Sequence, residues 1–189
     1  MVREGKMATF KEFGHRVSPA QTGEYRLNEG LEYPEGSVLL RVPRDFLWGI
    51  KPREAYSRVS RVRVETGLTY EGVAFLEKHP IVACVVPTNI GLMLPILQGH
   101  HRARYSGGFG IDVIPTAVCS LEVAAGFFDC GSTDYLEKEI WSGVAVCWMS
   151  FISRVSANGD CRRVYAPMNL RGIFSLEELV SSRVFRPFD

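Results

Sequence analysis

The sequence of 189 residues predicts an α+β fold, in which a mixed sheet with helices is followed by a helical carboxyl-terminal extension. Two observations lead to this class. Short apolar runs bounded by turn residues, which are typical of strands, alternate with segments whose apolar residues recur at helical spacing. After residue 120 the strand-like runs give way to helical ones. We therefore expect an irregular arm over 1–36, a core over 37–120 and a helical extension over 121–189 that packs on the core.

The pattern of apolar residues predicts four strands in the core, and helices in both the core and the extension. Strands are predicted over 37–42, 81–86, 92–97 and 112–118, and helices over 53–60, 69–78, 99–106, 133–154 and 175–183. His79-Pro80 ends the second of these helices, because the residue before a proline avoids helical dihedral angles. Ser175-Leu-Glu-Glu178 resembles a capping box and starts the last one.

Composition and charge narrow the functional classes. The formal net charge is only +1 at pH 7, and dedicated duplex-DNA binders are usually more basic, so any contact with nucleic acid must come from a local patch. The five cysteines include no Cys-x-x-Cys pair, which argues against a structural zinc site. Cys84 and Cys119 fall in apolar strands and are expected to be buried free thiols. The sequence lacks the pattern of a secretory signal peptide, a charged segment followed by an apolar one. We therefore expect a reduced, cytoplasmic protein.

The most informative segment runs from Leu94 to Arg104, where an apolar strand leads into a glycine, two histidines and an arginine. This layout places Gly99, His100, His101 and Arg102 on the first turn of a helix. Unpaired backbone N–H groups and the positive end of the helix dipole attract anions there. Glycine allows close approach of the backbone, and a guanidinium binds phosphate in a bidentate manner. The segment therefore predicts phosphate chemistry.

These residues also resemble a known signature. Gln98-Gly99-His100-His101-Arg102 is similar to the Asp-Gly-His-His-Arg motif of the ParB/sulfiredoxin superfamily. Upstream, Pro80–Val86 resembles the Pro-Ile-Val-Val strand of that superfamily. Lys51–Tyr56 is similar to the Pro-Arg-x-x-Phe segment of ParB and the Pro-His-Glu segment of free-serine kinases, and Val113–Pro115 to a Val-Pro-Val strand. The resemblance covers about 38–118 and implies a ParB/sulfiredoxin-like mixed sheet.

Within that superfamily the chain resembles the plasmid-borne oncogenic-suppression and fertility-inhibition proteins. The length, the lead-in over 42–49 and the unrelated last third are typical of that group. The resemblance implies an ATPase and DNase that acts on transferred or single-stranded DNA and blocks conjugation, with ATP and Mg²⁺ as cofactors. It also implies a type IV secretion coupling protein as a partner, and peripheral association with the inner face of the inner membrane through that partner.

The resemblance assigns roles to individual residues. It implies that Arg102 and His101 take part in catalysis, and that Glu54, by similarity to the serine kinases, is the base that accepts a proton from the attacking hydroxyl or water. Phosphate or nucleotide binding falls to Gly99, His100, His101, Arg102 and Arg53. Gln98 replaces the usual aspartate and lacks its charge, which puts an acid-dependent step in doubt. The sulfiredoxin reaction is excluded, because its cysteine would stand at His100.

Each candidate also has a structural interpretation. One of two adjacent helical histidines usually faces inward and packs or caps the helix. Glu54 could simply complement the helix dipole on an exposed first turn. Glu65, Glu71 and Glu77 are further carboxylates that could hold magnesium, and each equally fits an exposed helix charge.

A basic patch with aromatic residues is a second feature. It is expected to contain Arg58, Arg61, Arg63, Arg102 and Arg104 beside Tyr56 and Tyr105. Arginines interleaved with aromatic rings suit single-stranded nucleic acid, which needs stacking as well as backbone charge. A solvated helix face is the plainer interpretation of the same run.

The uncharged segment 140–152 is too short to span a bilayer as a helix. We expect a fully buried core helix, and an exposed face that binds a partner is the alternative. That alternative supports a second function, a non-catalytic inhibitor of a coupling protein, and burial in the monomer would remove its anchor. A third function, a small-molecule kinase, would require Glu54 and a closed pocket.

Overall fold

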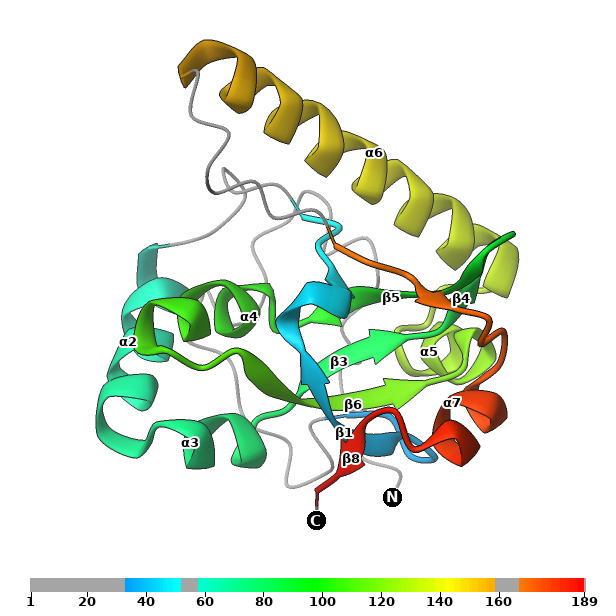
Figure 1. The fold of residues 1–189 in the computed structure, drawn as a ribbon, viewed down its shortest axis with the longest axis horizontal. Helices are drawn as coiled ribbons and strands as arrows, with labels where there is room; N and C mark the ends of the chain where they lie inside the picture. The colour runs from blue at the N-terminus through cyan, green and yellow to red at the C-terminus, as the bar shows by residue number, and fades with distance from the viewer. Residues whose placement is uncertain (1–32, 52–57, 159–166, 189) are drawn as a thin grey trace, which may run out of the picture.

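The computed structural model describes residues 33–51, 58–158 and 167–188. These residues form an eight-stranded sheet in the order β2-β5-β3-β6-β1-β8, with β4 and β7 paired to β5 (Figure 1). The strands are β1 (Val38–Pro43), β2 (Leu47–Trp48), β3 (Ile81–Cys84), β4 (Val86–Pro87), β5 (Gly91–Gln98), β6 (Val113–Cys119), β7 (Leu170–Arg171) and β8 (Arg186–Pro187). The predicted strands of the core are all present.

Both pairing directions occur in this sheet. β1 pairs antiparallel with β6, and β5 pairs antiparallel with β3. In contrast, β3 runs parallel to β6 with Ile81 opposite Thr116, and β2 runs parallel to β5. The sheet is therefore mixed and the protein is α+β, as the sequence predicts.

The described helices surround this sheet. They are α2 (Arg58–Glu71), α3 (Val73–Lys78), α4 (His100–Ser106), α5 (Leu121–Phe127), α6 (Thr133–Asn158) and α7 (Leu176–Ser182), with short 3₁₀ turns at Arg44–Phe46 and Gly107–Phe109. The expectation of one helix over 69–78 is wrong. Gly72 adopts φ 59°, a left-handed value that ends α2 and separates it from α3.

The side chains of the central strand β3 alternate between two hydrophobic cores, one on each face of the sheet. Ile81 and Ala83 belong to a cluster that includes residues of α2, α3, α4 and α7. Val82 and Cys84 belong to a second cluster with residues of α5 and α6. Because successive side chains of a strand point to opposite faces, the sheet lies between two helical layers. This arrangement explains why β3 is apolar throughout.

The extension after residue 120 is mainly helical but also completes the sheet. β7 pairs with β5, and β8 pairs with β1. Ser175 caps α7 by accepting a hydrogen bond from the N–H of Glu178, as the capping-box pattern predicts. Arg41 of β1 forms an ion pair with Glu77 and lies over the ring of Phe188, so the last residues also contact the core.

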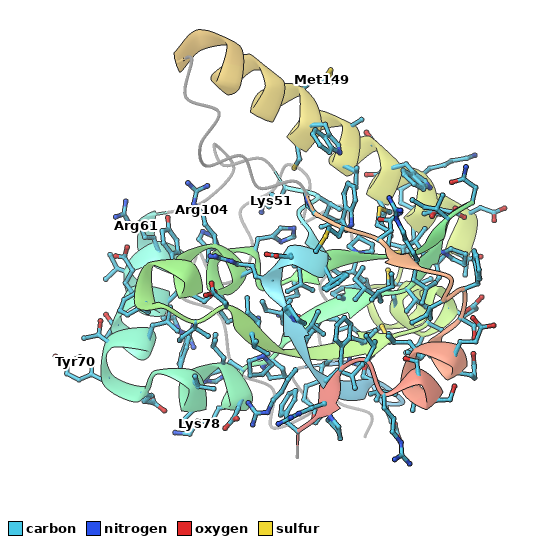
Figure 2. All side chains as sticks on the ribbon, viewed as in Figure 1. Lys51, Arg61, Tyr70, Lys78, Arg104 and Met149 are labelled. Atoms are coloured by element: carbon cyan, nitrogen blue, oxygen red, sulfur yellow. The ribbon has the colours of Figure 1, made fainter. Side chains whose placement is uncertain are left out.

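The expectation that segment 140–152 is fully buried is wrong, because α6 is buried on one side and exposed on another. Ile140 and Val144 are buried, whereas Trp141, Val146 and Met149 are 42%, 40% and 62% exposed. Met149 projects away from the sheet in Figure 2. Across the ranges that the structure describes, no helix is both long and apolar enough to cross a membrane.

Candidate functional site

The strand–glycine–helix junction predicted at Gly99 is present. Strand β5 ends at Gln98, Gly99 adopts φ 96°, and α4 begins at His100. The positive dihedral angle favours glycine at position 99, and a Cβ atom there would lie 2.9 Å from Nη2 of Arg102, so the guanidinium would have to shift. The first turn of α4 therefore starts at the carboxyl end of a central strand, as expected.

His100 is a structural residue of this turn. Its side chain is only 5% exposed, and its Nε2 accepts a hydrogen bond from the backbone N–H of Ile50 at 3.3 Å. Burial, together with the nearby charges of Lys51 and Arg102, lowers the pKa of His100 from 6.5 to about 3. The imidazole is thus neutral at physiological pH, and it fixes the Ile50 segment against α4.

Arg102 connects two elements. Its Nη1 donates a hydrogen bond to the carbonyl oxygen of His79 at 2.5 Å, so α4 is tied to the turn that follows α3. A guanidinium has five N–H donors in a planar fork, and this contact uses one of them. Arg102 therefore has a structural role that the sequence did not indicate.

His101, the second histidine, is half-buried and stacks on a tyrosine of its own helix. The rings of His101 and Tyr105 lie 6.2 Å apart at 23°. The guanidinium carbons of Arg61 and Arg104 lie 5.4 Å and 5.9 Å from the centroid of the Tyr105 ring. We call these four residues the arginine–tyrosine cluster. It joins α2 to α4 and forms the part of the expected basic patch that the structure brings together.

Lys51 is a cation to which the sequence analysis gave no role of its own. It directly follows Ile50, whose N–H is held by His100, and half-burial lowers the pKa of its ammonium group. In Figure 2 Arg61 and Arg104 project on the same side of the sheet as Lys51, which lies beneath α6 near the middle of the view, whereas Tyr70 and Lys78 lie on the opposite side. In the sequence, Lys51 was noted only as the first residue of the segment 51–56 that resembles ParB.

The other expected site residues are distributed differently. Arg53, Glu54 and Tyr56 lie outside the described residues, as does the side chain of Arg58. Arg63 is exposed on α2 but lies two positions from Arg61, about 200° around the helix. It therefore points away from the arginine–tyrosine cluster.

The three candidate magnesium carboxylates all form ion pairs. Glu65 pairs with Arg61, Glu71 with Lys78, and Glu77 with Arg41. Within the described part of the chain, no group of three histidine, cysteine, aspartate or glutamate side chains is placed to hold a metal ion. These residues therefore do not form a magnesium site of their own.

Comparison with known proteins adds no assignment: no protein-family model matches the sequence, and no curated protein matches it.

Proposed function

We propose that this protein binds ATP and hydrolyses it, cleaves DNA in a magnesium-dependent reaction, and thereby blocks conjugative DNA transfer from the cytoplasmic side. The proposal follows the resemblance to the plasmid oncogenic-suppression and fertility-inhibition proteins. Phosphate would be held by the first turn of α4, over Gly99–Arg102. Magnesium would enter with the nucleotide, because Mg²⁺ is commonly held by phosphate oxygens and water as well as by carboxylates.

One observation carries the proposal. Positive charge from separate segments lies near the end of β5, because the charges of Lys51 and of Arg102 on α4 both act on His100. The chain as a whole has a net charge of only +1, so this concentration is local. Phosphoryl transfer needs positioned cations and backbone donors more than covalent chemistry.

Within this site the residues have different tasks. The backbone N–H groups of the first turn and the Lys51 ammonium group would bind phosphate oxygens. His101, which is half-buried, would be the residue that transfers a proton in the reaction. The neutral His100 would hold the Ile50 segment, and through it Lys51, against the turn. The role of Glu54 as the base that activates the nucleophile remains part of the proposal.

The test compares ATP hydrolysis and DNA degradation with added Mg²⁺ in wild type, Lys51→Gln, His101→Asn and the control Lys78→Gln. Lys78 is exposed, forms an ion pair with Glu71, and projects away from the site. We expect both activities to fall at least about tenfold in the first two variants and to stay unchanged in the control. A wild-type protein inactive in both assays would refute the enzymatic function.

A non-catalytic inhibitor that binds a coupling protein is the second candidate function. The exposed side chains of Trp141, Val146 and Met149 on α6 favour it, because this part of the predicted anchor is not buried in the monomer. If the protein acts in this way, wild type should inhibit transfer without hydrolysing ATP, and Met149→Gln together with Val146→Gln should abolish the inhibition while the protein stays folded. Retained inhibition in that double variant would exclude α6 as the anchor.

A further inference from the structure

Helix α6 contacts segment 48–51 at two points. The indole rings of Trp48 and of Trp148 on α6 lie 6.3 Å apart at 58°. Further along the segment, a Cβ atom on Gly143 of α6 would lie 2.4 Å from the carbonyl oxygen of Ile50. The backbone of α6 therefore approaches the segment directly at Ile50, and an aromatic pair joins the two at Trp48.

Ile50 lies between two helices. Its side chain is buried in the same cluster as Ile140 and Val144 of α6. Its backbone N–H donates a hydrogen bond to Nε2 of His100 on α4, at 3.3 Å. Protein interiors contain few voids, so a residue that is held from both sides has little room to shift. The residue that follows Ile50 in the chain is Lys51.

Lys51 depends on this support because of the nature of its side chain. A lysine is a flexible chain with a point charge at its end, so the backbone must fix the region that the charge can reach. The charge of Lys51 acts on His100, and half-burial lowers the pKa of the Lys51 ammonium group. In Figure 2 Lys51 lies beneath α6. The position of the ammonium group therefore depends on how α6 packs on segment 48–51.

We propose that Trp148 and Gly143 of α6 are positioning residues for Lys51. By holding segment 48–51, they keep the ammonium group near His100 and within reach of a bound phosphate. The inference rests on the proposed function, because it names the residues that place the phosphate-binding lysine of that site. It gives the helical extension a role in the site itself, whereas all the site residues expected from the sequence precede residue 121.

The first test is the pH profile of Lys51 acetylation. Trace labelling with acetic anhydride between about pH 7 and 11, followed by peptide mass spectrometry, gives the midpoint pH of the Lys51 amine. The midpoint reports the pKa of the amine independently of how fast the reagent reaches it. Because Lys51 is half-buried, its midpoint in wild type should lie below the ordinary lysine value. A wild-type midpoint at the ordinary value would contradict this half-buried position.

Two tryptophans of α6 separate positioning from a general effect on the helix. Trp148→Ala should raise the Lys51 midpoint by at least about 0.5 pH unit, because the loosened segment exposes the ammonium group to water. Trp141→Ala is the matched control. Trp141 is 42% exposed and donates to Glu137 of its own helix, so this variant should keep the wild-type midpoint. Trp148→Phe keeps a ring against Trp48 and should also resemble wild type. An equal midpoint in Trp148→Ala and wild type would overturn the inference.

The second test is a double-variant cycle of ATP affinity. Calorimetry with EDTA present measures binding without magnesium-dependent hydrolysis. Trp148→Ala should weaken ATP binding about fivefold when Lys51 is present, but no more than about twofold in the Lys51→Gln background, because a positioning residue acts only through the residue that it positions. The same loss in both backgrounds would show that Trp148 acts independently of Lys51, and the inference would fail.

The outcomes distinguish this inference from the proposed function. If wild type does not bind ATP, the proposed function fails, and the acetylation profile still decides whether α6 positions Lys51. If wild type binds ATP but Trp148→Ala changes neither readout, the phosphate site stands and the positioning role is refuted. Circular dichroism checks that each variant is folded. Should Trp148→Ala unfold, Trp148→Leu replaces it, because leucine keeps an apolar side chain there but removes the ring contact with Trp48.

Discussion

Arg102 on α4 donates a hydrogen bond from Nη1 to the carbonyl oxygen of His79, 2.5 Å away, and so joins the residue after α3 to the first turn of α4. The guanidinium also lies against Gly99, where a Cβ atom would be 3.0 Å from its Nε. The arginine of the candidate site is therefore part of the local framework. An Arg102 variant could lose activity because phosphate binding is lost or because the fold around the site is destabilised. Measuring the free energy of unfolding distinguishes the two.

We expect Arg102→Ala to lower the free energy of unfolding by about 1–3 kcal/mol, because the charged hydrogen bond to His79 is lost and its carbonyl is left with fewer donors. Arg102→Lys should be less destabilising, since an ammonium group can still donate to that oxygen. Urea unfolding measures both. Unchanged stability in Arg102→Ala would mean that the His79 contact contributes little.

His100 gives the protein a defined sensitivity to acid. Its pKa is about 3 in the folded state, below the ordinary value of 6.5, because the side chain is buried. Between pH 6.5 and 3 the unfolded chain binds this proton and the folded protein does not, so the free energy of unfolding falls as pH falls through that window. Between pH 7 and pH 5 this group should remove about 2 kcal/mol.

His100→Gln keeps a hydrogen-bond acceptor for the N–H of Ile50 but cannot be protonated. Its stability should therefore decline less between pH 7 and pH 5 than that of wild type, as measured by urea unfolding at each pH. Parallel declines in the two proteins would show that His100 does not control the acid sensitivity.

Gly143 fixes the approach of α6 to the segment before Lys51. A Cβ atom at this position would lie 2.4 Å from the carbonyl oxygen of Ile50. Gly143→Ala should destabilise the protein by about 1–3 kcal/mol, because backbone atoms must shift. Gly126→Ala in α5 is the matched control, since nothing lies within 4 Å of its Cβ position, and it should be neutral or stabilising by up to about 1 kcal/mol. Thermal melting that ranks Gly143→Ala at or above Gly126→Ala would contradict this packing.

The cysteines should differ in reactivity. Burial raises the pKa of the Cys119 thiol to about 12 and raises that of Cys84 as well, and the two lie opposite each other on β6 and β3. Cys130 and Cys147 are half-buried. Iodoacetamide at pH 8, followed by peptide mass spectrometry, should label Cys130 and Cys147 in the folded protein and Cys84 and Cys119 only in denaturant. Early labelling of Cys84 would show that the strand pair opens.

Much of the fold was predictable because it depends on local patterns. Apolar runs identified the strands, and the glycine after β5 correctly marked the start of α4. The break at Gly72 was missed, because a glycine inside a helical pattern is often tolerated and only its positive φ ends the helix. The exposed side of α6 was given only as the alternative to full burial, for another reason. An apolar sequence does not reveal how much neighbouring surface is available to cover it.

The site was predictable in residue types but not in contacts. The sequence correctly indicated that one of the adjacent histidines faces inward, and His100 is the buried one. The hydrogen bond from Arg102 to His79 joins residues on different elements, so no local pattern could indicate it. Arg61 was expected beside Tyr105 in the basic patch, and the two residues meet because α2 and α4 pack together.

Strand β1 has its partners far along the chain: Val38 lies opposite Val118 of β6, and Leu40 lies opposite Pro187 of β8. Such distant pairings carry a large loop-closure entropy that must be overcome before any contact is gained. Folding of this protein should therefore be slow compared with helical bundles of similar size. Strand β1 would stay exposed during synthesis until the sequence of β6 is complete, and in that interval its unpaired edge is the place where intermolecular pairing would begin.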